Sequence, residues 1–242
     1  HRGEALTLDV EAKQVSAGTV EASLFVNRTL AKGRTTRERH FQGQVLMGKA
    51  PKKQKPSIQF TQDGLVSGPD ASGIYDLFFH TGVFQVMDSI PYLSDQNVVG
   101  YGHGPNTAIS TVMPVDSLCS DPFSREMALQ TAGILGMRED RSKYLPAGIE
   151  KVDFFASAKP GEKVITRVQA TECDEEHIRR FDVELVTTDG TLLQRLTGSR
   201  MIQAGPLPEG KQIEVVERRS TQLGRMTSVD AEDFLRGENL NV

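Results

Sequence analysis

Apolar and polar residues alternate along most of the first 48 residues of this 242-residue chain. An alternation with period two places the apolar side chains on one face of a strand. The pattern therefore predicts three antiparallel strands with one buried face, joined by turns near Ala17-Gly18 and Lys32-Gly33. The apolar positions are Leu6, Leu8, Val10 and Ala12 in the first run, Val20, Ala22, Leu24 and Val26 in the second, and Phe41, Val45 and Met47 in the third.

Residues 49–72 interrupt this alternation. The segment 49–56 is basic and contains Pro51 and Pro56, a composition that does not support a regular element. Its lysines have no aromatic residues between them, which favours a solvated linker over a nucleic-acid site. We therefore predict a linker between residues 1–48 and a second unit.

The second unit is expected at residues 73–204, followed by a polar tail or interdomain linker at 205–242. Its pattern predicts one long helix among strands that are separated by turns such as Asp189-Gly190. An antiparallel sheet wrapped around a central helix is the hotdog arrangement, so the predicted fold class is α+β. The expected elements are a short helix or turn at 74–79, strands at 84–93, 98–101, 107–113, 149–156, 164–171, 178–186 and 192–202, the long helix at 122–137, and a short helix at 229–235 in the tail.

Composition and charge exclude several classes of function. A hydrophobic content of 38%, a charged content of 25% and a net charge of −4 are ordinary for a soluble protein. They give no reason to expect nucleic acid or an anionic membrane as a partner, and no apolar run approaches the roughly 20 residues that span a bilayer. Cys119 and Cys173 are isolated, so we expect reduced thiols, no zinc site and a cytoplasmic protein. The start lacks both an apolar signal core and an initiator Met, which predicts a piece of a longer chain.

The candidate chemistry lies at the start of the long helix. Asp121 suits the N-cap and Pro122 the first helical position, so Glu126 and Gln130 fall one turn apart on the same face. An apolar stripe adjoins this pair, and a carboxyl group that is partly desolvated there is a candidate general acid. The alternative is a solvated glutamate near a helix N-terminus, where the helix dipole favours negative charge.

The run from Pro122 to Gln130 resembles the second catalytic motif of polyketide synthase dehydratase domains, in the form Pro-x-x-x-acid-x-x-Leu-Gln. Three more segments, 75–86, 145–152 and 196–201, resemble this family in the expected order, so the resemblance spans roughly residues 5–203. Members occur in iterative polyketide, enediyne and polyunsaturated fatty acid synthases. The resemblance implies a double hotdog that removes water from a 3-hydroxyacyl chain on an acyl carrier protein.

The chain also departs from the family pattern. The family's catalytic His lies in an HxxxGxxxxP motif, which is absent around all five histidines. We therefore expect the segment carrying that His to precede His1 or to be lost, which leaves the first hotdog, residues 1–48, incomplete. Glu126 stands where the family usually has Asp, and Thr81-Gly82 stands where it has Gly-Pro. The histidines tested against the motif are His1, His40, His80, His103 and His177.

The resemblance implies a role for each candidate site residue. Glu126 would donate a proton to the leaving hydroxyl, which requires an apolar pocket that raises its pKa, and Gln130 would hold its carboxyl group. His80 would contact substrate or pair with Glu126, or else be a hydrogen-bonded histidine in an apolar wall. No metal or organic cofactor is implied. The substrate-binding candidates are Tyr75, His80, Gly82, Phe84 and Tyr101, of which the two tyrosines are as easily core or rim residues.

Three functions remain open from the sequence. The first is a dehydratase-like domain of a multidomain polyketide or fatty-acid-type synthase. The second is an inactive pseudo-dehydratase with a structural, dimerisation or carrier-docking role, and the third is a hotdog acyl thioesterase. The expected partners are an acyl carrier protein with a phosphopantetheine-tethered chain, the other domains of the synthase, and a second copy in a homodimer.

Overall fold

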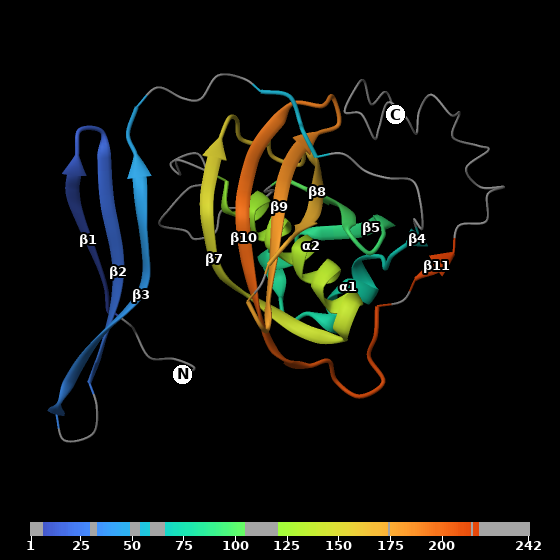
Figure 1. The fold of residues 1–242 in the computed structure, drawn as a ribbon, viewed down its shortest axis with the longest axis horizontal. Coiled ribbons are helices and arrows are strands. Elements are labelled where there is room, and N and C mark those ends of the chain that lie inside the picture. Colours follow the sequence, from blue (N-terminus) through green and yellow to red (C-terminus); the bar gives the residue numbers. More distant parts are fainter. Residues whose placement is uncertain are drawn as a thin grey trace. The chain divides into compact units, whose positions relative to one another are not determined.

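The computed structural model describes residues 7–29, 33–48, 54–58, 66–104, 121–173, 175–213 and 215–217 (Figure 1). The chain divides into two compact units, His1–Ala50 and Pro51–Val242. This division falls next to the end of the three strands expected at residues 1–48. Each unit is described by itself below.

Unit one is a three-stranded antiparallel sheet in the order β1-β2-β3. Its strands are β1 (Thr7–Ser16), β2 (Thr19–Thr29) and β3 (Thr35–Leu46), which confirms the three strands that the alternation predicts. The register places Val10 opposite Leu24, and Leu24 opposite Phe41, so one face of the sheet is apolar across all three strands.

The expectation that this face is buried is wrong for most of its side chains. Phe41 is 70% exposed and Val10 is 71% exposed, whereas Val26 is buried. The alternation determines which side of a strand is apolar. It does not determine whether a second layer covers that side, and this is why burial could not be predicted from the pattern.

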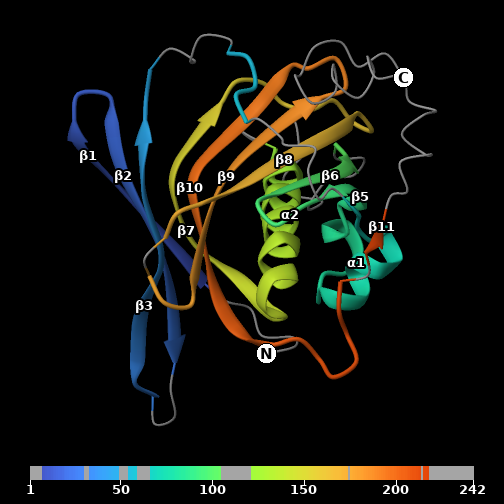
Figure 2. The ribbon, with the colours of Figure 1, turned by 45° about the vertical axis from the view of Figure 1, so that its right-hand side comes forward.

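Unit two is an eight-stranded sheet in the order β11-β4-β5-β6-β8-β9-β10-β7, with every neighbouring pair antiparallel. The sheet curves around the long helix α2 (Figures 1 and 2), so the hotdog arrangement and the α+β class are confirmed. The helices are α1 (Ala71–Leu77), the 3-10 helix η2 (Gly82–Phe84) and α2 (Pro122–Asp140). The strands are β4 (Val66–Ser67), β5 (Met87–Leu93), β6 (Asn97–His103), β7 (Ser142–Phe154), β8 (Lys163–Thr171), β9 (Ile178–Thr187), β10 (Leu192–Pro206) and β11 (Val216–Glu217).

Helix α2 begins as the sequence predicts. The Asp121 side chain accepts hydrogen bonds from the backbone N–H groups of Phe123 and Ser124, and Pro122 occupies the first turn. The helix ends three residues later than expected, at Asp140, where Arg141 adopts a left-handed conformation with φ of 55°.

Two glycines of β6 allow α2 to approach the sheet closely. A Cβ on Gly102 would lie 2.1 Å from the carbonyl oxygen of Val86 and 2.5 Å from the terminal methyl of Met127. A Cβ on Gly100 would lie 2.6 Å from the hydroxyl of Thr131. Only glycine fits at both positions, and the helix therefore packs directly against the backbone of β6.

Several boundaries differ from the prediction. Strand β5 begins at Met87 rather than at 84, because residues 82–84 form η2. Strand β7 begins at Ser142 rather than at 149, because the run 145–148, Leu-Pro-Ala-Gly, continues the strand although its composition is typical of a turn. Strand β10 continues to Pro206, beyond the expected end at 202. The strand predicted at 107–113 and the helix predicted at 229–235 lie outside the described residues.

Part of the predicted linker is bound to the sheet of unit two. Glu184 on β9, which is only 1% exposed, accepts hydrogen bonds from the backbone N–H groups of Ser57 at 2.9 Å and Ile58 at 3.1 Å. The guanidinium of Arg195 donates to the same carboxylate at 2.8 Å, and Arg167 donates to the carbonyl oxygen of Ile58 at 2.6 Å. We call residues 54–58 the strap. A buried carboxylate with both charged and backbone donors fixes it on the sheet.

Among the described residues, no helix is long and apolar enough to cross a membrane.

We predict that Glu184→Gln destabilises unit two by about 3 kcal/mol, because it leaves the buried Arg167 charge and the partly buried Arg195 charge without their carboxylate. The strap should also open locally, so the amide protons of Ser57 and Ile58 should exchange faster with solvent. Urea unfolding and hydrogen exchange measure the two effects.

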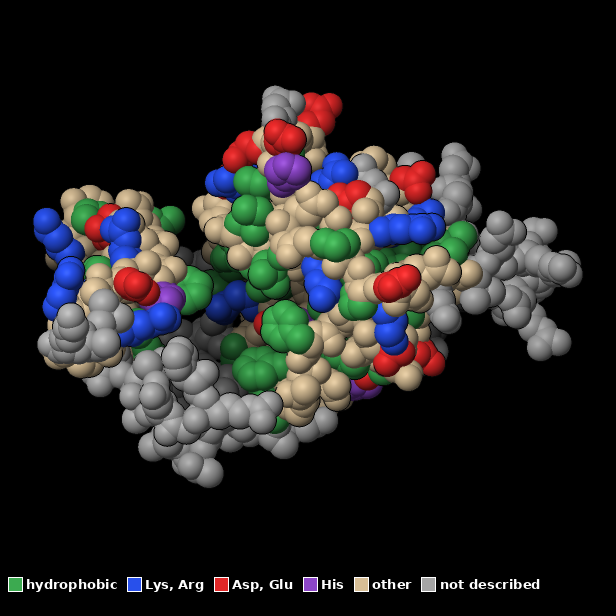
Figure 3. Space-filling model, turned by 90° about the horizontal axis from the view of Figure 1, so that it is seen from below, with side chains coloured by type: hydrophobic (Ala, Val, Ile, Leu, Met, Phe, Trp, Pro, Cys, Tyr) green, Lys and Arg blue, Asp and Glu red, His purple; other side chains and the backbone are tan. Residues whose placement is uncertain are grey.

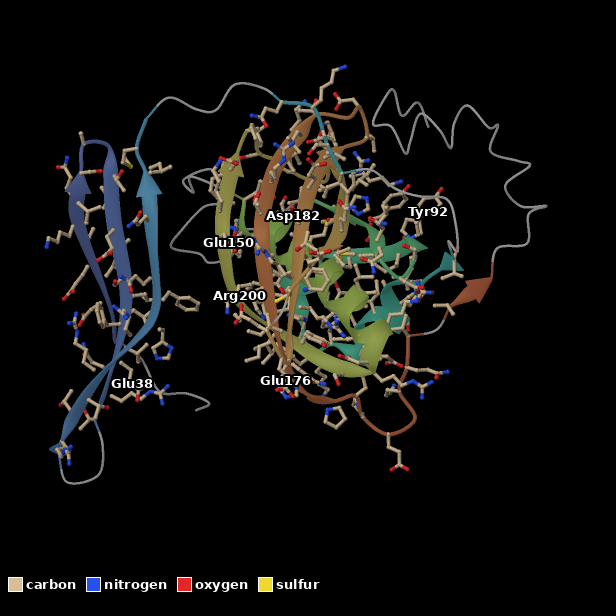
Figure 4. All side chains as sticks on the ribbon, viewed as in Figure 1. Glu38, Tyr92, Glu150, Glu176, Asp182 and Arg200 are labelled. Atoms are coloured by element: carbon tan, nitrogen blue, oxygen red, sulfur yellow. The ribbon has the colours of Figure 1, made fainter. Side chains whose placement is uncertain are left out.

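Glu150→Gln is the matched control. Glu150 lies on the edge strand β7 (Figure 4) and also pairs with an arginine, Arg180, at 2.7 Å, but its side chain is half exposed. An exposed ion pair contributes less than about 1 kcal/mol. Equal losses of stability in the two variants would contradict a specific role for the buried network.

Candidate active site

Glu126 and Gln130 lie one turn apart on α2, as the sequence predicts. The Nε2 amide of Gln130 donates one hydrogen bond to Glu126 Oε1 at 2.9 Å and another to the carbonyl oxygen of Phe84 at 2.8 Å. Gln130 is fully buried, so these bonds fix its amide in one orientation. The carboxyl group of Glu126 is therefore held against the backbone of η2.

His80 completes a pair with Glu126. Its Nε2 lies 2.9 Å from Glu126 Oε1, and the two side chains are 16% and 23% exposed. The imidazole also contacts the ring of Phe78 at 5.3 Å between centroids and stacks on the ring of Phe79 at 4.4 Å. The sequence leaves several alternatives open for His80. In the structure His80 both pairs with Glu126 and lies in an aromatic wall.

Tyr75 connects this group to α1 and β5. Its hydroxyl donates to Gln130 Oε1 at 3.1 Å and accepts from the backbone N–H of Met87 at 2.6 Å. Burial raises the pKa of Tyr75 to about 12, so the hydroxyl keeps its proton for the bond to Gln130. Both donors and the acceptor oxygen of the Gln130 amide are consequently satisfied.

The pKa of Glu126 is lowered, whereas the sequence analysis predicts that it is raised. Burial of the side chain raises its pKa, but the hydrogen bonds from His80 and Gln130 and the charge of His80 together hold it below the ordinary glutamate value. Glu126 is therefore an ionised carboxylate at neutral pH. The expectation of a raised pKa is wrong. The apolar stripe and Gln130 are visible in the sequence, whereas His80 reaches the carboxylate only in the fold.

A small pocket of about 40 Å³ adjoins the His80–Glu126 pair. Its wall is mainly apolar, and hydrophobic side chains also reach the surface of unit two in the view of Figure 3. The sequence signals Leu129 through the run 122–130, and Leu145, Pro146 and Met201 through the segments 145–152 and 196–201, but it does not signal Tyr144. The lining residues are Phe78, Phe79, His80, Glu126, Leu129, Gln130, Tyr144, Leu145, Pro146 and Met201.

The remaining candidates are placed differently. Phe84 contributes its carbonyl oxygen to Gln130, and Gly82 takes φ of 59° in η2, a conformation that suits glycine. Tyr101 does not join this group. Because Gly100 and Gly102 face α2, the alternation along β6 points Tyr101 to the opposite face, where Lys163 Nζ lies 4.2 Å from its ring centroid.

Within the part of the chain that the structure describes, no group of three or more His, Cys, Asp or Glu side chains is arranged to hold a metal ion.

The fold and the site define a hotdog domain with a carboxylate–histidine pair at the start of its central helix. A family model described as the polyketide synthase dehydratase N-terminal domain matches residues 73–210. This range contains His80 and Glu126 as well as Tyr75, Phe84 and Gln130, which support them. The chain belongs to this polyketide synthase dehydratase family. The match covers the predicted unit 73–204. Our interpretation of this unit as a second hotdog stays a prediction.

Solved structures share the fold at low sequence identity. A dehydratase domain of a trans-AT polyketide synthase from Brevibacillus brevis is 16% identical with a TM-score of 0.66, over 82% of this chain and 69% of that one. The dehydratase domain of the CurF module of the curacin polyketide synthase is 16% identical with a TM-score of 0.64, over 84% and 70%. A trans-acyltransferase polyketide synthase enoyl-isomerase is 14% identical with a TM-score of 0.58, over 83% and 74%. The fold therefore occurs in proteins named for different reactions.

A search of curated protein sequences finds no significant match to this chain.

We predict that His80→Ala raises the pKa of Glu126, because it removes one hydrogen bond to the carboxylate and one positive charge beside it. A carboxylate with a depressed pKa stabilises the fold above its unfolded pKa, and this contribution is lost as pH falls through the folded pKa. Wild-type stability should thus fall more steeply on acidification than that of His80→Ala. Carbon-13 NMR titration of the Glu126 carboxyl group measures the shift directly.

His103→Ala is the control for this titration. His103 pairs with Asp88 at 2.6 Å on the exposed side of β6 and has no contact with Glu126 among the ion pairs of the described residues. Its removal should leave the Glu126 titration unchanged. A Glu126 pKa that does not move in His80→Ala would refute the assigned cause of the depression.

Proposed function

We propose that this chain is the dehydratase domain of a multidomain polyketide or fatty-acid-type synthase, and that it eliminates water from 3-hydroxyacyl chains to give enoyl thioesters. The observation that carries the proposal is the His80–Glu126 pair, held by Gln130 beside an apolar pocket in a chain of this family. Elimination needs a base for the α-proton and an acid for the leaving hydroxyl. A histidine paired with a carboxylate can accept and return one proton beside a bound acyl chain.

The role of Glu126 follows from its ionisation. A carboxylate that is charged in the free protein stabilises a protonated imidazole next to it, so the pair acts as one proton-transfer group. Gln130 positions this carboxylate, since it donates to Glu126 and is held by Phe84 and Tyr75. Gly82, Phe84 and Tyr75 support the wall on which the acyl chain would lie, and no cofactor takes part in this reaction.

The proposed substrate is an acyl chain tethered by phosphopantetheine to an acyl carrier protein. The other domains of the synthase would deliver and remove this carrier protein in the cytoplasm, and a homodimer is the proposed assembly. A pocket of about 40 Å³ has room for a few water molecules, so a longer acyl chain would need wall side chains to move. Phe79 and Leu145 line the pocket and are exposed, which makes them the side chains that can move at least cost.

The lowered pKa of Glu126 favours one second candidate, an acyl thioesterase. An ionised carboxylate can activate water for attack on a thioester, and that reaction releases a free acid rather than an enoyl product. The small volume of the pocket also suits an inactive domain that binds a carrier protein without chemistry. An enoyl thioester, a free acid or the absence of a product distinguishes the dehydratase, the thioesterase and the inactive domain.

We predict that the wild-type chain converts a 3-hydroxyacyl thioester of a carrier protein into a product lighter by one water, detected by mass spectrometry. Glu126→Gln should lower this rate at least about 100-fold, because a neutral amide cannot stabilise an adjacent imidazolium. The fold should persist, since the Gln side chain keeps an oxygen that accepts from His80 and Gln130.

Glu150→Gln is the matched control, since the half-exposed Glu150 pairs with Arg180 and does not line the pocket. It should retain the wild-type rate. Release of free acid from the same substrate would assign the thioesterase function instead. A folded wild-type chain that gives neither product would support the non-catalytic role.

A further inference from the structure

The pocket beside Glu126 has an exposed side and a buried side. On the exposed side, Phe79 and Leu145 line the pocket with 75% and 41% of their surface open to solvent. On the buried side, Tyr144 and Met201 line it with only 3% and 1% exposed. A molecule that enters past Phe79 and Leu145 must therefore end against Tyr144 and Met201.

The buried side rests directly on helix α2. A Cβ on Gly136 would lie 3.0 Å from the ring of Tyr144, and a Cβ on Gly133 would lie 3.2 Å from the ring of Phe78 and 3.8 Å from the terminal methyl of Met201. Glycine is a poor helix former, yet here two glycines on one face of α2 let these bulky side chains lie on the helix backbone. The side chains consequently have no room to retreat toward the helix.

Tyr144 is fixed by its hydroxyl as well as by its ring. The hydroxyl donates a hydrogen bond to the carboxylate of Asp140 at the end of α2, and Arg179 lies 3.7 Å from the same carboxylate. Burial, together with this bond, raises the pKa of Tyr144 to about 12, so the hydroxyl keeps its proton for Asp140. The ring cannot turn out of the pocket without breaking this bond.

Little space separates Glu126 from the buried side. Gly133 follows Glu126 by two turns of α2, which is about 10 Å along the helix axis. In the proposed substrate the 3-hydroxyl group lies beside Glu126, so the carbons beyond C3 extend into the pocket. The free volume there is about 40 Å³, which suits a short chain, whereas a long chain meets the rings of Phe78 and Tyr144.

We propose that Phe78, Tyr144 and Met201 form the end wall of the acyl site and restrict it to short 3-hydroxyacyl chains, such as 3-hydroxybutyryl thioesters. This inference rests on the proposed dehydratase function and adds the substrate class to it. Glu126 keeps the place beside the leaving hydroxyl that the family resemblance implies. Movement of the exposed Phe79 and Leu145 widens the entrance of the site and leaves the end wall in place.

The test replaces Tyr144 with Leu in the full protein, which keeps an apolar side chain but removes the outer ring atoms and the hydroxyl. Tyr92→Leu is the matched control, because Tyr92 (Figure 4) is also buried but belongs to a separate apolar cluster and does not line the pocket. The probes are butyryl-pantetheine and decanoyl-pantetheine, which lack the 3-hydroxyl group and cannot lose water. Calorimetry measures their binding, and mass spectrometry measures enoyl formation from the corresponding 3-hydroxyacyl thioesters.

We expect the wild-type protein to bind butyryl-pantetheine at least about 10-fold more tightly than decanoyl-pantetheine. Each further buried methylene strengthens binding in a site without an end wall, so only a steric limit can produce this preference. Tyr144→Leu should bind decanoyl-pantetheine at least as tightly as butyryl-pantetheine, whereas Tyr92→Leu should keep the wild-type preference.

Thermal unfolding checks that Tyr144→Leu is folded. Phe78→Leu, which shortens another side chain of the same wall, replaces it if it is not, with the same expected gain for the decanoyl probe. Gly133→Ala tests the wall in the opposite direction, since its methyl group pushes the ring of Phe78 into the pocket. It should weaken binding of the butyryl probe. A wild-type protein that binds both probes equally, or an equal shift in Tyr92→Leu, would overturn the inference.

The two readouts separate this inference from the proposed function. Enoyl formation at equal rates from 3-hydroxybutyryl and 3-hydroxydecanoyl thioesters overturns the end wall and leaves the dehydratase function intact. A preference for the butyryl probe that Tyr144→Leu removes, without enoyl formation from any substrate, supports the end wall and overturns the dehydratase function. A wild-type protein that binds neither probe and forms no enoyl product overturns both.

Discussion

The close packing of α2 on β6 is the constraint on which the site depends. Gly100 and Gly102 remove the side chains that would hold the helix away from the sheet, and Met127 and Thr131 occupy the space. Glu126 and Gln130 belong to the same turns of the helix, so their height above the sheet is set by this contact. A larger side chain at either glycine would displace the carboxylate as well as the core.

The fold could be predicted further than the site. Helix α2 follows from local signals, an N-cap at Asp121 with Pro122 after it, and the strands follow from alternation. The His80–Glu126 pair joins residues 46 positions apart, and no local pattern reports such a contact. The ionisation of Glu126 could not be predicted for the same reason, since Gln130 lies one turn away on the helix but His80 must first be placed by the fold.

The sequence signal for the strap lies in Glu184, not in residues 54–58 themselves. Residues 54–58 have the composition of a solvated linker, which says nothing about what binds them. Glu184, however, lies inside the apolar run of β9, where a charge is costly unless it is paired. A carboxylate in such a run indicates that donors from elsewhere must reach it, and the strap and Arg195 provide them.

The amide of Gln130 has its two donors and its oxygen taken by three separate segments, α2, η2 and α1. Turning this amide over would break all three bonds at once, so the dipoles around the carboxylate are oriented before any ligand arrives. Water around a free acid would have to reorient as charge develops. Here the dipoles are already oriented by folding, so that reorientation is not needed during a reaction. What the chain brings to a reacting molecule is an environment that is already polarised in one direction.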